Sequence, residues 1–256
     1  MRLLPRRLRY GEDASLVEHL DELRSRIVVC LIAVAVAFGI TFGFHEHLME
    51  WLRRPLPPDR RHALLTLGVT EPFFTSLKVS LYAGIALALP VWLWQLWSFL
   101  APAVQETTQR AVSAFVALGT ALFGGGLVFA YVIVLPPALH FLTNYDTHLY
   151  NIQIRASTYY AFVTAVLIAV ALVFELPIFV LSLVRLGILS AATLRRHRRI
   201  GIVLVVAVAV LLPTVDPVSL AFEAVPLVLL FELSIWLAVY FERRWWPARE
   251  AAARAA

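Results

Sequence analysis

The sequence is poor in charged residues and holds a single cysteine. Only 15% of its 256 residues are charged, whereas soluble domains carry about 25%. Hydrophobic residues make up 61% of the chain and gather in long runs. This shortage of charge excludes an ordinary soluble domain and predicts an all-α polytopic membrane protein. Because Cys30 is the only cysteine, an internal disulfide is excluded.

The motifs of common soluble enzymes are also absent. The sequence has no Gly-x-Ser-x-Gly, no His-Glu-x-x-His and no phosphate-binding glycine loop. His45-Glu46-His47 offers two histidines, but no further ligand cluster accompanies them, so we expect no metal ion. We therefore predict a protein that is not an enzyme, needs no cofactor and binds no nucleic acid.

The first charged stretch leads into a membrane helix. Ser15 and Glu18 have the spacing of a capping box, which predicts a helix start. Ile27–Phe44 follows without a charge or a proline, and it is long enough to enter a bilayer. The acids before this run and the lack of an Ala-x-Ala-like exit favour a retained helix over a signal peptide. Glu22 and its neighbouring acids either favour the helix start or receive a cation, for which guanidinium is the best match.

Five further apolar runs complete a prediction of six transmembrane helices. They are Phe73–Leu100, Ala111–Leu135, Thr158–Leu186, Ile200–Leu212 and Val218–Phe241. The fifth is about 20 Å long as a helix, which is short for a hydrocarbon core of about 30 Å. Between these runs we expect an external loop at His45–Thr70 with a short helix at Glu46–Arg53, and a second external loop at Leu142–Ser157. We also expect a helix end at Pro136-Pro137, a basic loop at 195–199 and a turn at Pro213–Pro217.

The arginines are placed unevenly between the two sides of the predicted bundle. Loops on one side hold fifteen: Arg2, Arg6, Arg7, Arg9, Arg24, Arg26, Arg110, Arg195, Arg196, Arg198, Arg199, Arg243, Arg244, Arg249 and Arg254. The other side holds five: Arg53, Arg54, Arg60, Arg61 and Arg155. By the positive-inside rule, both termini lie in the cytoplasm. We expect the membrane to be the cytoplasmic (inner) membrane. We interpret 1–256 as one membrane domain, with a basic N-terminus (1–14), a six-helix core (15–241) and a basic tail (242–256).

Glu175 is an acid in the middle of the predicted fourth helix. An ionisable residue at that depth is expensive and is by default a functional hypothesis, although a protonated glutamate bonded to a neighbouring helix is the simpler interpretation. With Lys78 and Glu232 it would suit a proton-coupled carrier, but the absence of an internal repeat and the short fifth helix count against one. An intramembrane protease would need a serine–histidine or aspartate pair, which the sequence does not offer.

Several motifs, taken in order, resemble a single family. They are His19-Leu20-Asp21-Glu22-Leu23-Arg24-Ser25-Arg26, Glu71-Pro72-Phe73-Phe74 with Lys78, Pro90–Ala103, Phe129-Ala130-Tyr131 with Pro136, Phe174-Glu175-Leu176-Pro177, Pro213 with Asp216, and Phe231-Glu232. The set covers about Ser15–Phe241 and resembles TatC, the multi-spanning subunit of the twin-arginine protein translocase.

The resemblance implies a concave helix bundle with short fifth and sixth helices. It implies a core receptor that binds the twin-arginine signal peptides of folded precursor proteins and moves those proteins across the membrane. The implied partners are single-helix membrane proteins like TatA and TatB, the lipid bilayer and further copies of the chain. The proton gradient supplies the energy in the family.

The resemblance also implies roles for particular residues. Glu22 matches the first of two glutamates that meet the signal's arginines, and the second falls at Thr108, two residues after Glu106. Because Thr108 is not acidic, Glu106 is the candidate substitute, and a family member that assembles without reading signals is an alternative. Phe99 lines the signal site by position, and the N-terminal motif adds His19 and Arg24. The polar residues expected within the membrane or at partner contacts are Glu175, Lys78, Gln95, Asp216 and Glu232.

Overall fold

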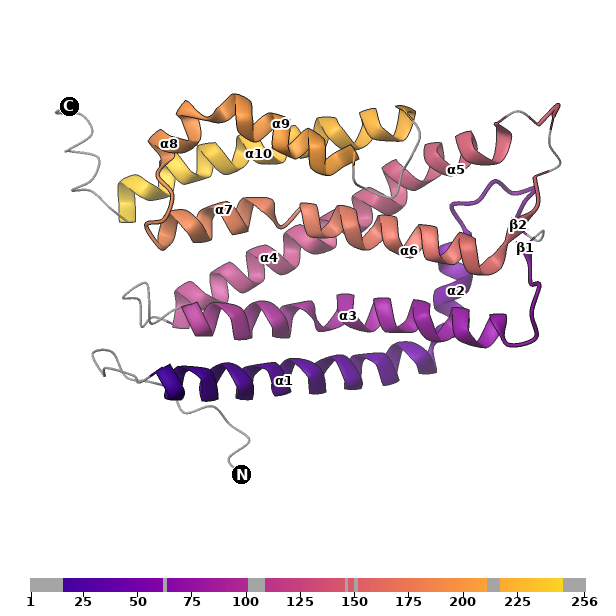
Figure 1. Ribbon diagram of the computed structural model, residues 1–256, viewed down its shortest axis with the longest axis horizontal. Helices are drawn as coiled ribbons and strands as arrows, with labels where there is room; N and C mark the ends of the chain where they lie inside the picture. Colours follow the sequence, from indigo (N-terminus) through magenta and orange to yellow (C-terminus); the bar gives the residue numbers. More distant parts are fainter. Residues whose placement is uncertain are drawn as a thin grey trace. The chain divides into compact units, whose positions relative to one another are not determined.

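The described part of the chain is folded almost wholly into helices. The computed structural model describes residues 16–61, 64–100, 109–145, 147–149, 152–210 and 217–245. The helices are α1 (Leu16–Gly43), α2 (His45–Arg53), α3 (Glu71–Leu100), α4 (Gln109–Phe129), α5 (Leu135–Asn144), α6 (Ala156–Val173), α7 (Leu176–Arg185), α8 (Ala191–Arg196), α9 (Arg198–Val210) and α10 (Pro217–Trp245) (Figure 1). A π-helix, Ala130–Val134, joins α4 to α5, and two short strands, β1 (Leu64–Leu65) and β2 (Ile154–Arg155), pair in parallel.

Contacts within the chain divide it into two compact units. The first comprises Met1–Arg54, Pro58–Ala121 and Gln153–Thr164. The second comprises Pro55–Pro57, Leu122–Ile152 and Ala165–Ala256. The first unit therefore holds α1, α2, α3 and both strands, and the second holds α5, α7, α8, α9 and α10. The single membrane domain over 1–256 stays a prediction.

Five helical stretches among the described residues are long and apolar enough to cross a membrane. They are Leu20–Gly43, Glu71–Phe99, Val112–Asn144, Ala156–Arg185 and Ala224–Glu242. These stretches coincide with five of the six predicted helices. The predicted fifth helix corresponds to α9, of which the structure describes 13 residues, up to the end of the described range at Val210. The expectation of a short sixth helix is wrong, because α10 has 29 residues and includes Pro226, a residue that long apolar helices tolerate.

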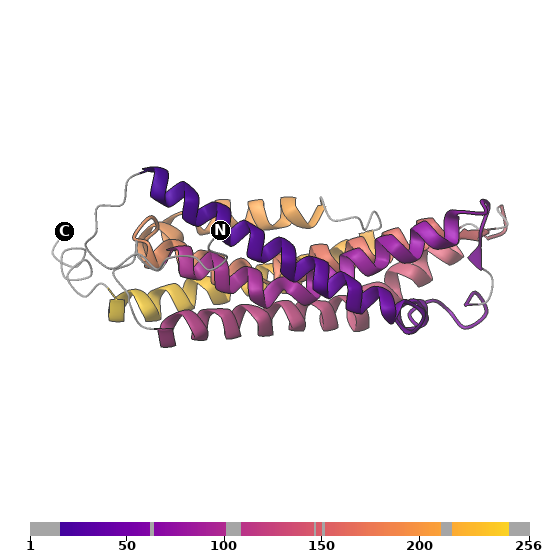
Figure 2. The same ribbon diagram turned by 90° about the horizontal axis from the view of Figure 1, so that it is seen from below.

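In the first unit, α1 lies along α3 (Figures 1 and 2). Gly84 of α3 permits the close approach, because a Cβ atom there would lie 2.9 Å from the Cα and N atoms of Phe38. Near this crossing, the Thr41 hydroxyl donates a hydrogen bond to the Ser80 carbonyl oxygen over 2.7 Å. These contacts fix the register of the two helices, and with it which part of α1 meets the end of α3.

The predicted third helix does not end at Pro136-Pro137. The chain passes from α4 through the π-helix into α5, which continues to Asn144. The Leu135 N–H bonds to the Ala130 carbonyl, five residues back. A proline ring clashes with the carbonyl four residues earlier in an α-helix, and the wider π turn just before the prolines makes room for the rings. The external loop expected at Leu142–Ser157 accordingly begins later, after Asn144.

The predicted fourth helix, Thr158–Leu186, is interrupted near its middle. Glu175 stands between α6 and α7 and caps α7 without a side-chain hydrogen bond. Pro177 has no N–H to offer the Val173 carbonyl, and the Glu175 N–H bonds to the Leu172 carbonyl, three residues back, over 3.1 Å. Glu175 therefore lies at the break between α6 and α7, and the expectation of one continuous helix is wrong.

The basic stretch at 195–199 is helical rather than a loop. Its arginines end α8 and begin α9. The Ser190 hydroxyl caps α8 by accepting a hydrogen bond from the Thr193 N–H over 3.1 Å. The Glu242 carboxylate of α10 accepts another from the Ala191 N–H over 2.5 Å. These acceptors satisfy N–H groups that the start of α8 leaves unpaired, so the chain is already helical when it reaches Arg195.

Candidate functional site

A buried ion pair lies near the start of α1. Glu22 and Arg26 stand one helical turn apart, and both residues are 8% exposed. The Nε and Nη2 atoms of Arg26 donate hydrogen bonds to Oε1 of Glu22 over 3.1 and 2.5 Å. Both bonds end on the same oxygen, so Arg26 engages one side of the carboxylate.

The end of α3 completes this site. Nη1 of Arg26 donates to the carbonyl oxygen and Oε1 of Gln95 over 3.3 and 3.1 Å, and Nη2 donates to the Ser98 carbonyl over 3.2 Å. Ser98 belongs to the last turn of α3, where carbonyls have no partner within the helix and favour a nearby cation. The five bonds match the five N–H groups of a guanidinium, so Arg26 is fully engaged between two helices.

The structure brings two predicted residues, Glu22 and Gln95, together through a third that was not singled out. In the sequence, Arg26 is part of a motif and one of many arginines on the same side of the bundle. Its spacing from Glu22 could have identified it, because opposite charges four residues apart meet on a helix surface. Its bond to Gln95, 69 residues away, could not be read from spacing.

The other residues predicted for the signal site are only partly described. Arg24 is exposed, away from the ion pair, and Phe99 is half-buried. The side chain of His19 lies outside the described residues, as do Glu106 and Thr108. The ring of Trp97 in α3 stacks on Phe115 in α4 with centroids 4.0 Å apart. The segment that carries Glu106 thus connects two helices that are packed together at the same end of α3 as Arg26.

Glu175 forms the second candidate site, in the second unit. Both of its carboxylate oxygens are buried and have no hydrogen-bond partner among the described residues. The neighbouring Phe174 packs on Phe129 with ring centroids 5.3 Å apart. Gly126 faces the same turn, where a Cβ atom would lie 2.7 Å from the Ala171 Cα. A buried carboxylate without a bond is costly, so the fold itself gives no reason for an acid at this position.

The remaining predicted polar residues have separate surroundings. Lys78 is exposed on α3. Glu232 of α10 accepts a hydrogen bond from Nε of Arg198 in α9 over 2.5 Å, which ties these two helices together. Asp216 and most of the turn predicted around it lie outside the described residues.

The histidines considered for a metal site are placed apart from other ligands. The Nδ1 atom of His45 lies 2.8 Å from the Phe42 carbonyl oxygen. Over the ranges that the structure describes, no three His, Cys, Asp or Glu side chains gather in a way that could hold a metal ion.

An ion pair at the other end of α3 was not foreseen from the sequence. Nε and Nη2 of Arg155 donate to the two oxygens of Glu71 over 2.9 and 3.1 Å. Glu71 also accepts hydrogen bonds from the N–H groups of Leu67 and Ser157 over 2.9 and 3.3 Å. Bonding to Glu71 and its negative charge raise the pKa of the Arg155 guanidinium above its usual value. Both carboxylate oxygens are engaged, so this cluster holds the paired strands against α3 rather than awaiting a ligand.

Comparison with known proteins identifies the family. The family model described as Sec-independent protein translocase protein (TatC) matches residues 18–226. The Sec-independent protein translocase protein TatC of Koribacter versatilis is 35% identical over 244 residues, with 91% of this chain and 89% of that protein covered. The protein of the same name from Frankia casuarinae is 35% identical over 255 residues, with 93% and 70% covered.

Solved structures agree with the sequence comparison. The crystal structure of the twin arginine translocase receptor TatC in DDM is 34% identical and superposes with a TM-score of 0.76, covering 86% of this chain and 99% of that one. A second crystal structure of the receptor gives a TM-score of 0.74 at 34% identity, with 87% and 98% covered. The chain therefore belongs to the TatC family of Sec-independent protein translocase subunits.

Proposed function

We propose that this protein is the signal-reading core of its translocase and that Glu22 receives an arginine of a twin-arginine signal peptide. The geometry of Glu22 carries the proposal, because Arg26 engages only Oε1 of the carboxylate. An ionised carboxylate offers about four acceptor sites on two oxygens. Glu22 thus retains capacity for a second guanidinium, and the similar solved structures are described as twin arginine translocase receptors.

Arg26 has a positioning role in this proposal. Its bonds to Gln95 and Ser98 hold the guanidinium between α1 and α3, and the guanidinium in turn fixes the Glu22 side chain. A carboxylate that is already ordered loses less conformational freedom when a ligand binds. The signal peptide would therefore meet an acceptor in a fixed orientation near the membrane boundary.

A binding measurement with a fluorescent peptide that carries two arginines tests this site. Glu22→Gln is expected to weaken binding at least about tenfold, because a hydrogen bond to a charged group is replaced by one to a neutral amide. Asp21→Asn is the matched control, since it removes the same charge from an exposed neighbour on α1. Equal losses in the two variants would assign the effect to net charge, and unchanged binding by Glu22→Gln would remove Glu22 from the site.

The proposal includes assembly with single-helix membrane partners at Glu175. Two buried carboxylate oxygens without a described partner support it, because a polar group on an added helix would supply the missing bonds. Glu175→Gln is expected to keep the partner bound during purification, whereas Glu175→Leu is expected to release it. Retention of the partner by the leucine variant at the wild-type level would contradict the assignment.

We also propose six crossings with both termini in the cytoplasm. The uneven arginine distribution supports this orientation, and the 13 residues of α9 would cross where the bilayer is locally thinned. In a Cys30→Ala background, a membrane-impermeant thiol reagent should label Asp59→Cys from outside and Ala192→Cys only after the membrane is opened. The reverse pattern would invert the topology.

A further inference from the structure

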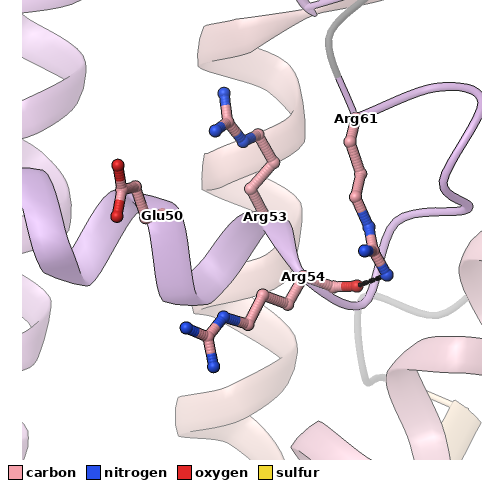
Figure 3. A pocket seen from close by; sticks show the side chains of 4 residues that line it. All are labelled: Glu50, Arg53, Arg54 and Arg61. Atoms are coloured by element: carbon pink, nitrogen blue, oxygen red, sulfur yellow. Dashed lines mark hydrogen bonds between the residues drawn. The ribbon is translucent and has the colours of Figure 1, made fainter.

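A basic pocket lies at the end of α2, in the first unit. It has a volume of about 180 Å³ and is lined by Glu50, Arg53, Arg54 and Arg61 (Figure 3). Three of the four lining residues are arginines, and the fourth is a glutamate. This cluster is distinct from the Glu22 site, since the two lie at opposite ends of α1.

The chain places this pocket at a membrane boundary. The first candidate span ends at Gly43, α2 begins at His45, and the next span begins at Glu71. The segment between these spans must therefore lie where the chain leaves the apolar layer. Trp51 of α2 is 41% exposed, and exposed tryptophan is typical of the membrane–water interface.

Several hydrogen bonds fix the backbone around the pocket. The hydroxyl groups of Tyr159 and Tyr160 donate to the carbonyl oxygens of Leu52 and Met49 over 2.8 and 3.2 Å. The Arg61 side chain reaches back to the Arg54 carbonyl oxygen over 2.7 Å, as Figure 3 shows. These bonds secure the last turn of α2 and tie the following loop to it, so the pocket is built into the fold.

The charges on the α2 side of the pocket are not neutralised by the neighbouring acid. Glu50 precedes Arg53 and Arg54 by three and four residues, the spacings at which ion pairs form along a helix. No ion pair within 4.0 Å joins Glu50 to either arginine, and neither pairs with another carboxylate among the described residues. Two guanidinium groups at the membrane boundary therefore favour an anion from outside the chain.

We propose that this pocket binds the phosphate of an anionic phospholipid headgroup, of the phosphatidylglycerol type. Guanidinium forks match phosphate oxygens in geometry and charge. A water molecule takes about 30 Å³ of the liquid, so the pocket has room for a phosphate group with a few waters. The unpaired charges of Arg53 and Arg54 favour a headgroup with net negative charge over a zwitterionic one. The position beside a span brings lipid phosphates within reach.

Lipid titration of the full-length, detergent-solubilised protein tests the proposal. Dioleoyl-phosphatidylglycerol or dioleoyl-phosphatidylcholine is added, and bound lipid is counted by native mass spectrometry. Phosphatidylglycerol is expected to bind in preference. Arg53→Gln with Arg54→Gln should weaken its binding at least about tenfold, because two charged donors to the phosphate are lost. Arg60→Gln is the control, because Arg60 belongs to the same loop, pairs with Asp59 at 3.3 Å and does not line the pocket.

Three outcomes would overturn the proposal. The first is equal binding of the two lipids by the wild-type protein, or equal losses in the double variant and in Arg60→Gln. The second is full displacement of phosphatidylglycerol by millimolar inorganic phosphate, which would make a soluble anion the ligand. The third is no recovery at all in Arg53→Lys with Arg54→Lys, because this variant keeps both charges but loses the guanidinium forks and should therefore recover part of the binding. A lysine variant that binds as weakly as the glutamine variant would mean that the loss reflects altered local structure.

Discussion

Removing Arg26 while leaving Glu22 in place should destabilise the protein strongly. In Arg26→Met, the buried Glu22 carboxylate loses its counter-charge, and the Ser98 carbonyl loses its donor. Removing one partner of a buried ion pair costs about 3–5 kcal/mol. The side chains of Arg26 and Glu22 are 9% and 6% exposed, so water can replace little of the lost interaction. We expect a loss of unfolding free energy in that range.

The double variant Arg26→Met with Glu22→Gln should recover much of this loss. Without the charge on Glu22, the methionine variant no longer buries an unpaired carboxylate, and the two changes should couple by about 2–3 kcal/mol. The unfolding free energies of the wild type, the two single variants and the double variant are measured in detergent by denaturant or thermal unfolding, followed by circular dichroism. Arg24→Met changes an exposed arginine on the same helix and should stay within about 0.5 kcal/mol of the wild type.

Two results would refute this reasoning. One is a loss below about 1 kcal/mol for Arg26→Met, which is the scale of an exposed pair. The other is a double variant whose loss equals the sum of the single losses, because additivity is the behaviour of residues that do not interact.

Three further changes test contacts in the first unit. Gly84→Ala should lower the unfolding free energy by about 1–3 kcal/mol through overpacking, whereas Gly39→Ala, with open space around it, should not; thermal unfolding compares them. Tyr159→Phe removes the hydrogen bond to Leu52 and should cost about 1 kcal/mol, read by denaturant unfolding. Arg155→Gln should speed hydrogen exchange at the Leu67 N–H with little change in global stability, because its side chain is 49% exposed.

The spans could be predicted from the sequence because hydropathy alone determines where a chain can enter a bilayer. Ile27–Phe44, for example, lies almost wholly within the first candidate span. The helix ends were harder to predict, since the effect of a proline on a helix depends on the conformation of the helical turn that precedes it. Pro136 is accommodated by a π-helix and Pro177 coincides with a break, and nothing in the local sequence separates the two cases.

The candidate sites also include residues that the sequence identifies and residues that only the structure reveals. Glu22 and Glu175 stood out because acids beside or within apolar runs are rare. The spacing of Arg26 from Glu22 was a local signal, but its bond to Gln95, 69 residues away, forms only after helices pack. The same holds for Glu71, whose partner Arg155 lies 84 residues away. A sequence shows which side chains need partners, but tertiary packing determines which partners they find.

The ion pair between Glu71 and Arg155 can form only late in the synthesis of the chain. Glu71 begins α3, but its partner follows 84 residues later, which is roughly 4–17 s of translation at about 5–20 residues per second. During that interval α1 and α3 can already pack together, while β1 has no strand beside it and the Glu71 carboxylate lacks its counter-ion. The nascent chain thus has a closed helix hairpin and an open loop at the same time. A protease or chaperone acting on that side of the membrane would meet the loop before Arg155 closes it.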